Sequence, residues 1–229
     1  MRLYWQKFHI RTVQVWGMTE TTHAATAMWT PIDILEERSE PTAPQGQPVF
    51  GTEMRVLDDD GTVLPRDGNS IGHLQVRGHA CANGYLKRPD VDILDQQGWL
   101  RTGDLAAIET GNFLRVTDRL KDVIKSGGEW ISSIDLENAA CSHAGVAEAA
   151  VIGVPHPHWQ ERPVLYVVCK PGQQVSAEDL RSHLAGLVAK WWLPEEILFV
   201  ETLPHYSTGK VKKDILRTQY RANAAHRPA

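Results

Sequence analysis

The chain has 229 residues, of which 42% are hydrophobic and 23% charged, enough apolar residues for one large domain or two small ones. The formal net charge of −4 excludes a whole-chain attraction to nucleic acid or to an anionic membrane, so no nucleic-acid partner is expected. No segment approaches the ~20 apolar residues of a membrane-spanning helix, and the first residues lack the apolar core of a signal peptide. An integral membrane segment is therefore not expected.

The cysteines and histidines give no metal or disulfide motif. Cys81, Cys141 and Cys169 lie far apart and never in a C-x-x-C spacing, which predicts free thiols. Free thiols are typical of a reducing compartment, and a cytoplasmic protein is expected. His156-x-His158 lies beside prolines in a loop without a third ligand at helical or strand spacing, so a metal site there is disfavoured.

The first predicted element is a strand over residues 10–16, where Ile10, Val13 and Val15 suit a sheet. The hydroxyl-rich segment 18–22 follows it and is expected to emerge from the strand end into a crevice, as ligand-binding residues do in open α/β sheets. Residues 30–48 contain four prolines and predict a long irregular connection.

Residues 49–118 predict a small, mostly antiparallel β body. An Asp-Gly pair at residues 60–61 lies between two alternating runs and is a strong hairpin signal. The alternation over residues 71–78 predicts another strand. Asp104 stands between a glycine and a leucine, where its carboxylate is suited to accept hydrogen bonds from a vicinal diol such as that of a ribose. A simple turn over residues 102–104 is the alternative, and spacing alone favours that turn.

Residues 118–132 join two regions that differ in pattern. Gly127 and Gly128 permit a tight turn and close backbone approach, while Arg119 and Lys125 are able to hold anionic oxygens. We interpret this stretch as one wall of a phosphate-bearing active site. A solvated charged turn between strands is equally supported by the stretch alone.

The region after this joint predicts a compact α+β unit of about a hundred residues. Ser133 and Ser176 are the expected N-caps of two helices. The strand-like runs are residues 146–154, 164–169 and 196–200, and a terminal helix is expected over residues 212–220.

Lys210 follows a flexible Ser-Thr-Gly sequence, which predicts a lysine presented on a mobile loop. Such a lysine is able to neutralise charge that develops on a carboxylate or phosphate oxygen. The alternative, favoured for this loop in isolation, is a basic solvated segment ahead of the terminal helix.

Four motifs occur in an order that resembles the adenylate-forming superfamily of acyl-CoA synthetases, adenylation domains and firefly luciferase. They are Trp16-Gly17-Met18-Thr19-Glu20, Arg101-Thr102-Gly103-Asp104, Asp118 to Asp122 running into Ser126-Gly127-Gly128, and Pro204 through Lys210. The runs at residues 127–138 and 156–163 are most similar to medium- and long-chain fatty acyl-CoA ligases. The resemblance covers the chain to about Arg217.

The resemblance implies a nucleotide site that uses ATP and releases AMP. By position, Trp16 would pack on the adenine, Thr19 would contact phosphate, and Glu20 would help to hold Mg²⁺. Asp104 would bind the ribose hydroxyls with the assistance of Arg119. The implied catalytic residues are Lys210, Thr19 and Glu20, and the implied nucleotide-binding residues are Trp16, Gly17, Thr19, Asp104, Arg119 and Lys210.

The resemblance also implies two half-reactions, in which a carboxylate first forms an acyl-adenylate and coenzyme A then displaces AMP. Lys121 matches a hinge about which a small lid domain turns between the two steps. The residues implied to line the coenzyme A entry are Lys125, Ser126, Gly127, Gly128 and Trp130.

No residue before Trp16 supplies the Ser/Thr/Gly-rich phosphate loop or the acyl pocket of that family. We therefore expect the C-terminal part of a fatty acyl-CoA ligase, with residues 1–120 ending the large domain and residues 121–229 forming the lid. The fold class expected is α+β, and a separate N-terminal polypeptide is a possible partner. The alternatives are a ligase for another acid, aryl or amino, and a non-catalytic remnant or interaction module.

Overall fold

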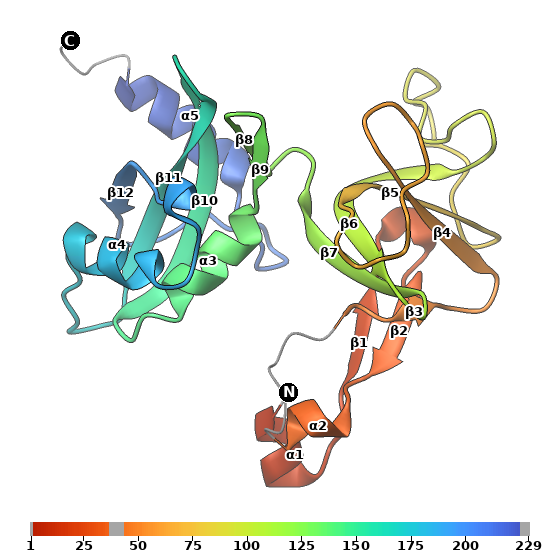
Figure 1. Cartoon of the computed structure of the whole chain (residues 1–229), viewed down its shortest axis with the longest axis horizontal. Helices are drawn as coiled ribbons and strands as arrows, with labels where there is room; N and C mark the ends of the chain where they lie inside the picture. The colour runs from red at the N-terminus through yellow and green to blue at the C-terminus, as the bar shows by residue number, and fades with distance from the viewer. Residues whose placement is uncertain (1, 37–43, 225–229) are drawn as a thin grey trace. The chain divides into compact units, whose positions relative to one another are not determined.

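The computed structural model of this protein describes residues 2–36 and 44–224, and the fold is α+β. It divides into two compact units, Met1–Leu120 and Lys121–Ala229, each described here by itself (Figure 1). None of the helices in the described ranges is long and apolar enough to cross a membrane.

The first unit begins with a small antiparallel sheet in the order β1-β2-β3 (Figure 1). The strands are β1 Val13–Trp16, β2 Thr26–Trp29 and β3 Gln47–Pro48. The helices are α1 Arg2–Phe8 and α2 Ile32–Leu35, and the short 3-10 helix Thr19–Thr21 follows β1.

Two expectations for this region need correction. The predicted strand exists, but its partner β2 is antiparallel, so the argument from the carboxyl ends of a parallel sheet does not apply to it. The connection 30–48 is not wholly irregular, because it contains α2 and β3, while its residues 37–43 lie outside the described part of the chain.

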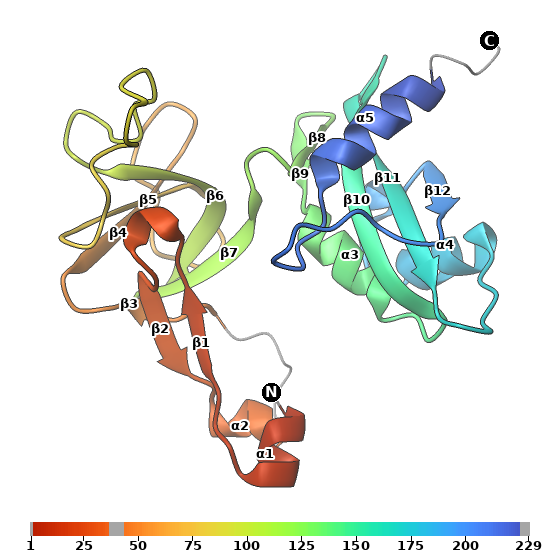
Figure 2. The ribbon, with the colours of Figure 1, turned by 180° about the vertical axis from the view of Figure 1, so that it is seen from behind.

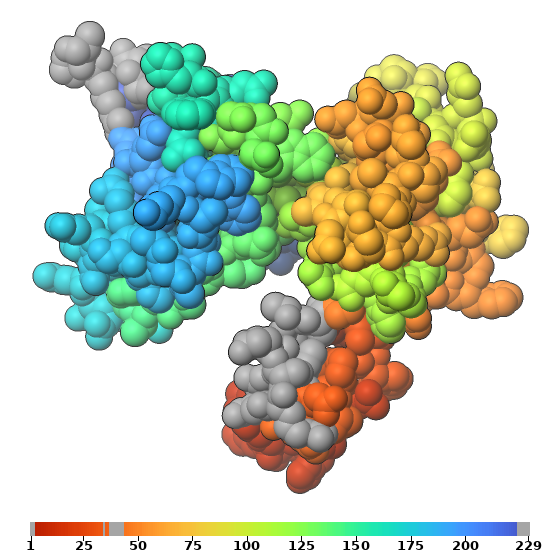
Figure 3. All heavy atoms as spheres, in the orientation of Figure 1, coloured from red at the N-terminus to blue at the C-terminus, as the bar shows by residue number. Residues whose placement is uncertain are grey.

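The predicted β body is confirmed as a four-stranded antiparallel sheet in the order β4-β5-β6-β7. Its strands are β4 Thr52–Leu57, β5 Gly72–Gly78, β6 Leu100–Glu109 and β7 Phe113–Arg119. Its core is a cluster of buried aliphatic side chains from all four strands, including Met54, Leu74, Leu100 and Leu114. Figure 3 shows the orange and gold residues between β4 and β5 covering part of the near face of this unit.

The Asp-Gly turn is present but shorter than a full hairpin. The carboxylate of Asp58 accepts hydrogen bonds from the backbone N–H groups of Asp60 at 3.0 Å and Thr62 at 2.8 Å. Leu57 and Val63 form an isolated bridge. Pro65 follows closely, and because proline lacks a backbone donor, the second arm does not continue as a strand.

The second unit has a sheet in the order β10-β11-β8-β9, with β12 pairing parallel to β11 (Figure 2). The hairpin strands are β8 Ile124–Ser126 and β9 Glu129–Ile131. The long strands are β10 Val146–His156 and β11 Gln160–Cys169, and β12 covers Glu196–Phe199.

Helices bury both faces of this sheet. Figures 1 and 2 show α3 Ser133–Cys141 and α4 Ala177–Ala185 on one face and α5 Lys213–Ala224 on the other. Alternate residues of the long strands therefore enter two cores. Val151 and Leu165 pack in the core that α3 and α4 cover, and the neighbouring residues Ile152 and Val164 pack in the core that includes Leu216 of α5.

The N-caps of α3 and α4 are both serines, but one differs from the prediction. Ser176 caps α4 as expected, since its side chain accepts from the N–H of Asp179 at 3.0 Å. The cap of α3 is Ser132 rather than Ser133, and Ser132 Oγ accepts from the N–H of Asp135 at 3.1 Å. Ser133 is already inside the helix, where its hydroxyl accepts from Lys213 Nζ.

We expect Ser132→Ala to destabilise the second unit by about 1 kcal/mol, because one N–H group of the first turn of α3 loses its acceptor. Hydrogen exchange of the α3 amides reports on this unit alone and should accelerate accordingly. Ser182→Ala is the matched control, since Ser182 lies exposed within α4 and bonds only a carbonyl of its own helix. Equal effects of the two changes would contradict the cap assignment.

Candidate functional site

A buried carboxylate connects three strands of the first unit. Asp104 on β6 is the register partner of Arg119 on β7, and Arg119 Nε lies 2.6 Å from Asp104 Oδ1. Trp16, the last residue of β1, donates its indole N–H to Asp104 Oδ2 at 2.9 Å. Asp104 is only 2% exposed, so its charge is held by these partners rather than by water.

Local sequence explains the position of Asp104. Gly103 has a φ of +73°, which a glycine adopts without steric cost. The turn interpretation of residues 102–104 is wrong, because these residues lie within the ten-residue strand β6. Asp104 also lines a cavity of about 250 Å³. A carboxylate at this position is the acceptor type that a vicinal diol requires.

Glu20 lies in the 3-10 helix after β1 and is held by a neighbouring segment. Its carbonyl oxygen accepts from the N–H of Ala82 at 2.7 Å, and its carboxylate accepts from the hydroxyl of Tyr85. This hydrogen bond raises the pKa of Tyr85, because ionised Tyr85 would be unable to donate. Thr19 is exposed beside Glu20, as a phosphate-contacting residue would need to be.

Mg²⁺ bound together with a nucleotide requires only one or two protein carboxylates, since phosphates and water supply its other ligands. The half-exposed carboxylate of Glu20 fits that requirement. Glu20 would hold the ion, and the ion would supply charge neutralisation to the phosphates.

Gly17 has a structural reason to be glycine. A Cβ at this position would lie 1.7 Å from the carbonyl oxygen of His23, which is far inside van der Waals contact. Gly17 therefore permits the backbone of the strand end to pass close to residue 23, and its predicted role at the nucleotide is not needed to explain it.

In the second unit, Gly127 and Gly128 form the predicted turn between β8 and β9, with φ values of +62° and +87°. The N–H of Gly127 donates to the carbonyl of Trp159 at 3.0 Å, which joins the hairpin to the start of β11. The N–H of Lys125 donates to a carboxylate oxygen of Glu161 at 3.1 Å. These bonds fix a turn whose outer edge is open.

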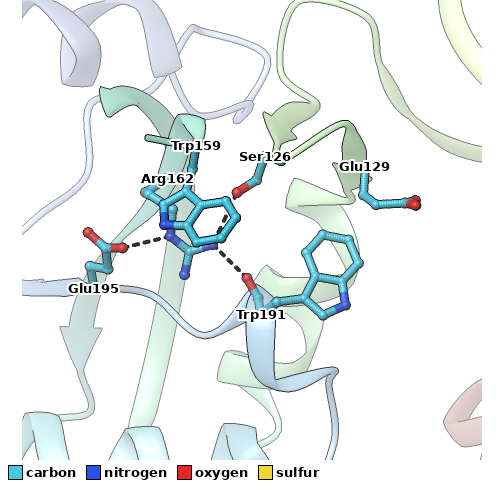
Figure 4. Close-up of a pocket in the computed structure, with 7 residues that line it drawn as sticks. Ser126, Glu129, Trp159, Arg162, Trp191 and Glu195 are labelled. Atoms are coloured by element: carbon cyan, nitrogen blue, oxygen red, sulfur yellow. Dashed lines mark hydrogen bonds and ion pairs between the residues drawn. The ribbon is translucent and has the colours of Figure 1, made fainter. Parts of the chain in front are cut away.

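A cavity of about 340 Å³ lies beside this turn, and Figure 4 shows the side chains around it. Trp159 and Trp191 are about half exposed, at 51% and 41%. Two carboxylates stand at its edge. Its lining residues are Ser126, Gly127, Glu129, Trp159, Arg162, Trp191 and Glu195.

Arg162 organises this cavity. Its guanidinium donates to Ser126 Oγ at 3.1 Å, to the carbonyl of Trp191 at 2.6 Å and to Glu195 Oε1 at 2.8 Å (Figure 4). A further N–H bonds the carbonyl of Leu193 at 3.0 Å. With only 11% of its side chain exposed, Arg162 holds the 191–195 segment against the hairpin.

Five residues had been predicted to line the coenzyme entry, and the structure brings only Ser126 and Gly127 to this cavity. Lys125 and Gly128 are exposed at the hairpin, and Trp130 is half-buried in the middle of β9. Sequence reasoning missed five lining residues as site residues: Glu129, Trp159, Arg162, Trp191 and Glu195. The aromatic and basic residues at 156–163 are the sequence pattern that could have indicated Trp159 and Arg162.

The Lys210 loop is closed by backbone hydrogen bonds. His205 and Val211 form an isolated bridge, and the N–H of Tyr206 donates to the carbonyl of Lys210 at 2.8 Å. His205 Nε2 lies 3.2 Å from a carboxylate oxygen of Glu148 on β10. Lys210 is exposed, as its predicted role requires, and Lys121, the predicted hinge residue, is also exposed. The loop therefore presents Lys210 on a defined backbone.

The three cysteines are free thiols, as their spacing predicted. Desolvation raises the pKa of Cys81 and of Cys141 above the ordinary thiol value. Neither has the lowered pKa of an activated nucleophile.

Two family models match the chain in sequence order. The model described as AMP-binding enzyme matches residues 1–86, and the model described as AMP-binding enzyme C-terminal domain matches residues 135–210.

The curated relatives and solved structures agree with these models. The chain is 43% identical over 223 residues to a 3-methylmercaptopropionyl-CoA ligase of Ruegeria lacuscaerulensis, covering 94% of this chain and 41% of the relative. It is 40% identical to a long-chain-fatty-acid–CoA ligase of Thermus thermophilus, covering 94% and 41%. The crystal structure of ATP-bound MatB from Rhodopseudomonas palustris matches with a TM-score of 0.83 and 30% identity, covering 96% and 42%. The chain thus spans about two fifths of the length of these relatives.

We expect the Tyr85–Glu20 bond to persist to alkaline pH. Because the folded pKa of Tyr85 is raised above its unfolded value near 10, the bond contributes fully below about pH 10 and is lost as pH rises through the folded pKa. Glu20→Gln should lower the midpoint of phenol ionisation, measured by ultraviolet absorbance. Tyr85→Phe identifies that component of the titration, and an unchanged midpoint in Glu20→Gln would refute the contact.

The two turn glycines provide a matched pair of substitutions. Alanine at either position carries a left-handed backbone cost of about 1 kcal/mol. A Cβ at Gly127 would also lie 3.0 Å from a ring carbon of Trp159, whereas a Cβ at Gly128 would meet nothing within 4 Å. Gly127→Ala should therefore change the tryptophan near-ultraviolet circular dichroism, and Gly128→Ala should not. The same spectrum from both variants would contradict the predicted contact.

Proposed function

Because this chain belongs to the AMP-binding enzyme family, we propose that it functions in an ATP-dependent acid–thiol ligase that joins a carboxylic acid to coenzyme A. The observation that carries the proposal is the buried Asp104 carboxylate, held by Arg119 and Trp16 at the edge of a cavity. A carboxylate fixed in this way is an acceptor for the two ribose hydroxyls of ATP.

The first proposed step is formation of an acyl-adenylate. A carboxylate oxygen of the acid attacks the α-phosphorus of ATP, and the bond to the β-phosphate oxygen breaks to release pyrophosphate. Lys210 supplies a positive charge for the oxygens that gain negative charge in this step. Thr19 contacts the phosphates of ATP, and Glu20 holds the Mg²⁺ ion that is bound to them.

The second proposed step transfers the acyl group to coenzyme A. The thiolate attacks the acyl carbonyl carbon, and AMP leaves with the electrons of the cleaved C–O bond. The cavity beside Gly127 supports a coenzyme site, since Trp159 and Trp191 present aromatic surface to an adenine ring. The side chain of Lys125 is exposed at the same hairpin and is able to attract a phosphate.

We propose a fatty acid as the acid substrate, on the similarity to the long-chain-fatty-acid–CoA ligase. The relative that acts on 3-methylmercaptopropionate favours a second candidate, a short sulfur-containing acid. Both candidates use the same nucleotide and coenzyme residues. A cytoplasmic location is proposed on the free thiols alone.

An interaction module without catalysis remains the second class of function. It is favoured by the exposure of apolar residues on the first two strands, where Val13, Val15 and Trp29 are 45%, 57% and 58% exposed. Such a module would bind another polypeptide and no nucleotide, so nucleotide binding separates the two proposals.

The deciding experiment measures ATP binding by the 229-residue chain with Mg²⁺ present, followed by carboxylate-dependent ATP–pyrophosphate exchange. We expect Asp104→Asn to weaken ATP binding by about tenfold or more, because a hydrogen bond to a charged group is lost. Asp90→Asn is the matched control, since Asp90 is an exposed carboxylate of the same unit that pairs with Arg88.

The exchange assay compares straight-chain acids of graded length with 3-methylmercaptopropionate. Exchange above background identifies the preferred acid as the one with the highest rate. ATP binding that is unaffected by Asp104→Asn would remove the ribose assignment. Binding of ATP by the folded chain would exclude the interaction module.

A further inference from the structure

The loop that carries Lys210 is packed on the second unit at both of its ends. Leu203 is 4% exposed, and Val211 is partly buried against the same core, which includes Ile152 of β10. Figure 2 shows the dark blue segment that leads into α5 crossing the face of β10. The residues between these two ends, 204–210, present the lysine.

One side chain of β10 reaches this loop. Glu148 Oε2 lies 3.2 Å from His205 Nε2, and the two side chains are 49% and 34% exposed. When the imidazole is protonated, the contact is an ion pair. His205 also forms a backbone bridge with Val211 across the loop, so the contact with Glu148 bears on both arms.

A β-bulge directs Glu148 to the loop. The register of β10 with β11 shifts between Val146 and Glu148. Glu148 shares a face with Ala150, which packs in the core below the loop. Val146 packs instead in the core that α3 and α4 cover. The bulge therefore places a buried valine and a charged carboxylate on opposite faces, where regular alternation would place both on one face.

The loop is also attached to α5. The hydroxyl of Tyr206 donates to Asp214 Oδ1 at 3.3 Å, and Lys212 Nζ lies 5.1 Å from the centre of the Tyr206 ring. Asp214 is in the first turn of α5. These contacts attach the loop to the helix that follows it in sequence.

The helix α5 is itself fixed within the second unit. Lys213 Nζ lies 2.7 Å from Glu137 Oε1 on α3, and Arg217 Nη2 lies 2.9 Å from Asp122 Oδ1. A loop attached only to α5 could still turn about its own base. The contact of Glu148 provides a second attachment on a different element, which opposes that turning.

From these contacts we infer that Glu148 is a positioning residue for Lys210. Its carboxylate holds His205 against β10, and together with the α5 contacts of Tyr206 it restricts the backbone that presents the lysine. A charge that must meet a developing charge is most effective when surrounding contacts fix its position. The role of Lys210 in acyl-adenylate formation rests on the proposed function, whereas the attachment of the loop does not.

The test measures the loop in the full chain and uses no nucleotide. Hydrogen exchange is followed at the N–H groups of Tyr206 and Gly209, which donate to the carbonyls of Lys210 and Tyr206 and close the loop. The measurement is made at about pH 5.5, where histidine side chains are ordinarily protonated. In a second sample, Lys210→Cys carries a nitroxide whose mobility is read by electron paramagnetic resonance, with the native cysteines replaced by alanine.

Glu148→Gln keeps the size of the side chain and removes its charge. We expect this change to accelerate exchange at Tyr206 and Gly209 about threefold and to increase the mobility of the nitroxide, with the amides of β10 and α5 unchanged. Glu148→Lys should loosen the loop further, because it places a like charge opposite His205. Adding His205→Glu to Glu148→Lys should restore the pair in reverse order and return exchange to near the wild-type rate. Glu201→Gln is the matched control, since Glu201 is an exposed carboxylate that precedes the same loop.

Three results would overturn the inference. Unchanged loop exchange in Glu148→Gln would mean that the contact does not hold the loop. Equal acceleration throughout β10 and α5 would mean that Glu148 supports only the fold. A reversed pair that is no better than Glu148→Lys alone would mean that charge pairing is not the cause. Because neither measurement uses nucleotide, a failure of ATP binding would count against the proposed reaction and leave the attachment of the loop in place.

Discussion

The first unit depends on the burial of one carboxylate. Asp104 is only 2% exposed, and Arg119 and Trp16 supply partners to its carboxylate. Those partners come from β7 and β1, so the same carboxylate also connects the small sheet to the larger one. The contacts of Asp104 are thus part of the packing of the unit.

The second unit is stabilised differently. Its sheet is apolar on both faces, because adjacent residues such as Val151 and Ile152 enter separate cores. Helices α3 and α4 close one face and α5 closes the other (Figures 1 and 2). The cavity beside Gly127 lies outside these cores, and its shape depends on the Arg162 network rather than on apolar packing. A site built in this way can vary in its lining while the fold stays the same.

Local patterns predicted most of the elements, and longer-range contacts explain most of the failures at the candidate sites. Ser176 was identified as a cap because the capping contact spans only three residues. The position of Asp104 was ambiguous, since its partner Trp16 lies 88 residues away and no local pattern shows that contact. Trp191 lines the cavity, and its carbonyl accepts a hydrogen bond from Arg162, 29 residues earlier. The spacing of residues within a segment predicted the helices and strands. Contacts between distant segments could not be predicted from that spacing.

The hydrogen bonds around the joint also bear on how such units can be exchanged between proteins. A cut between Leu120 and Lys121 leaves the hydrogen bond of Gly103 with Leu120 on one side and that of Arg217 with Asp122 on the other. Each side keeps its own hydrogen bonds, so a recombination event at this peptide bond transfers a complete second unit. A cut a few residues later would separate Arg217 from its acceptors. The joint is therefore a boundary at which recombination moves each compact unit with its own hydrogen bonds.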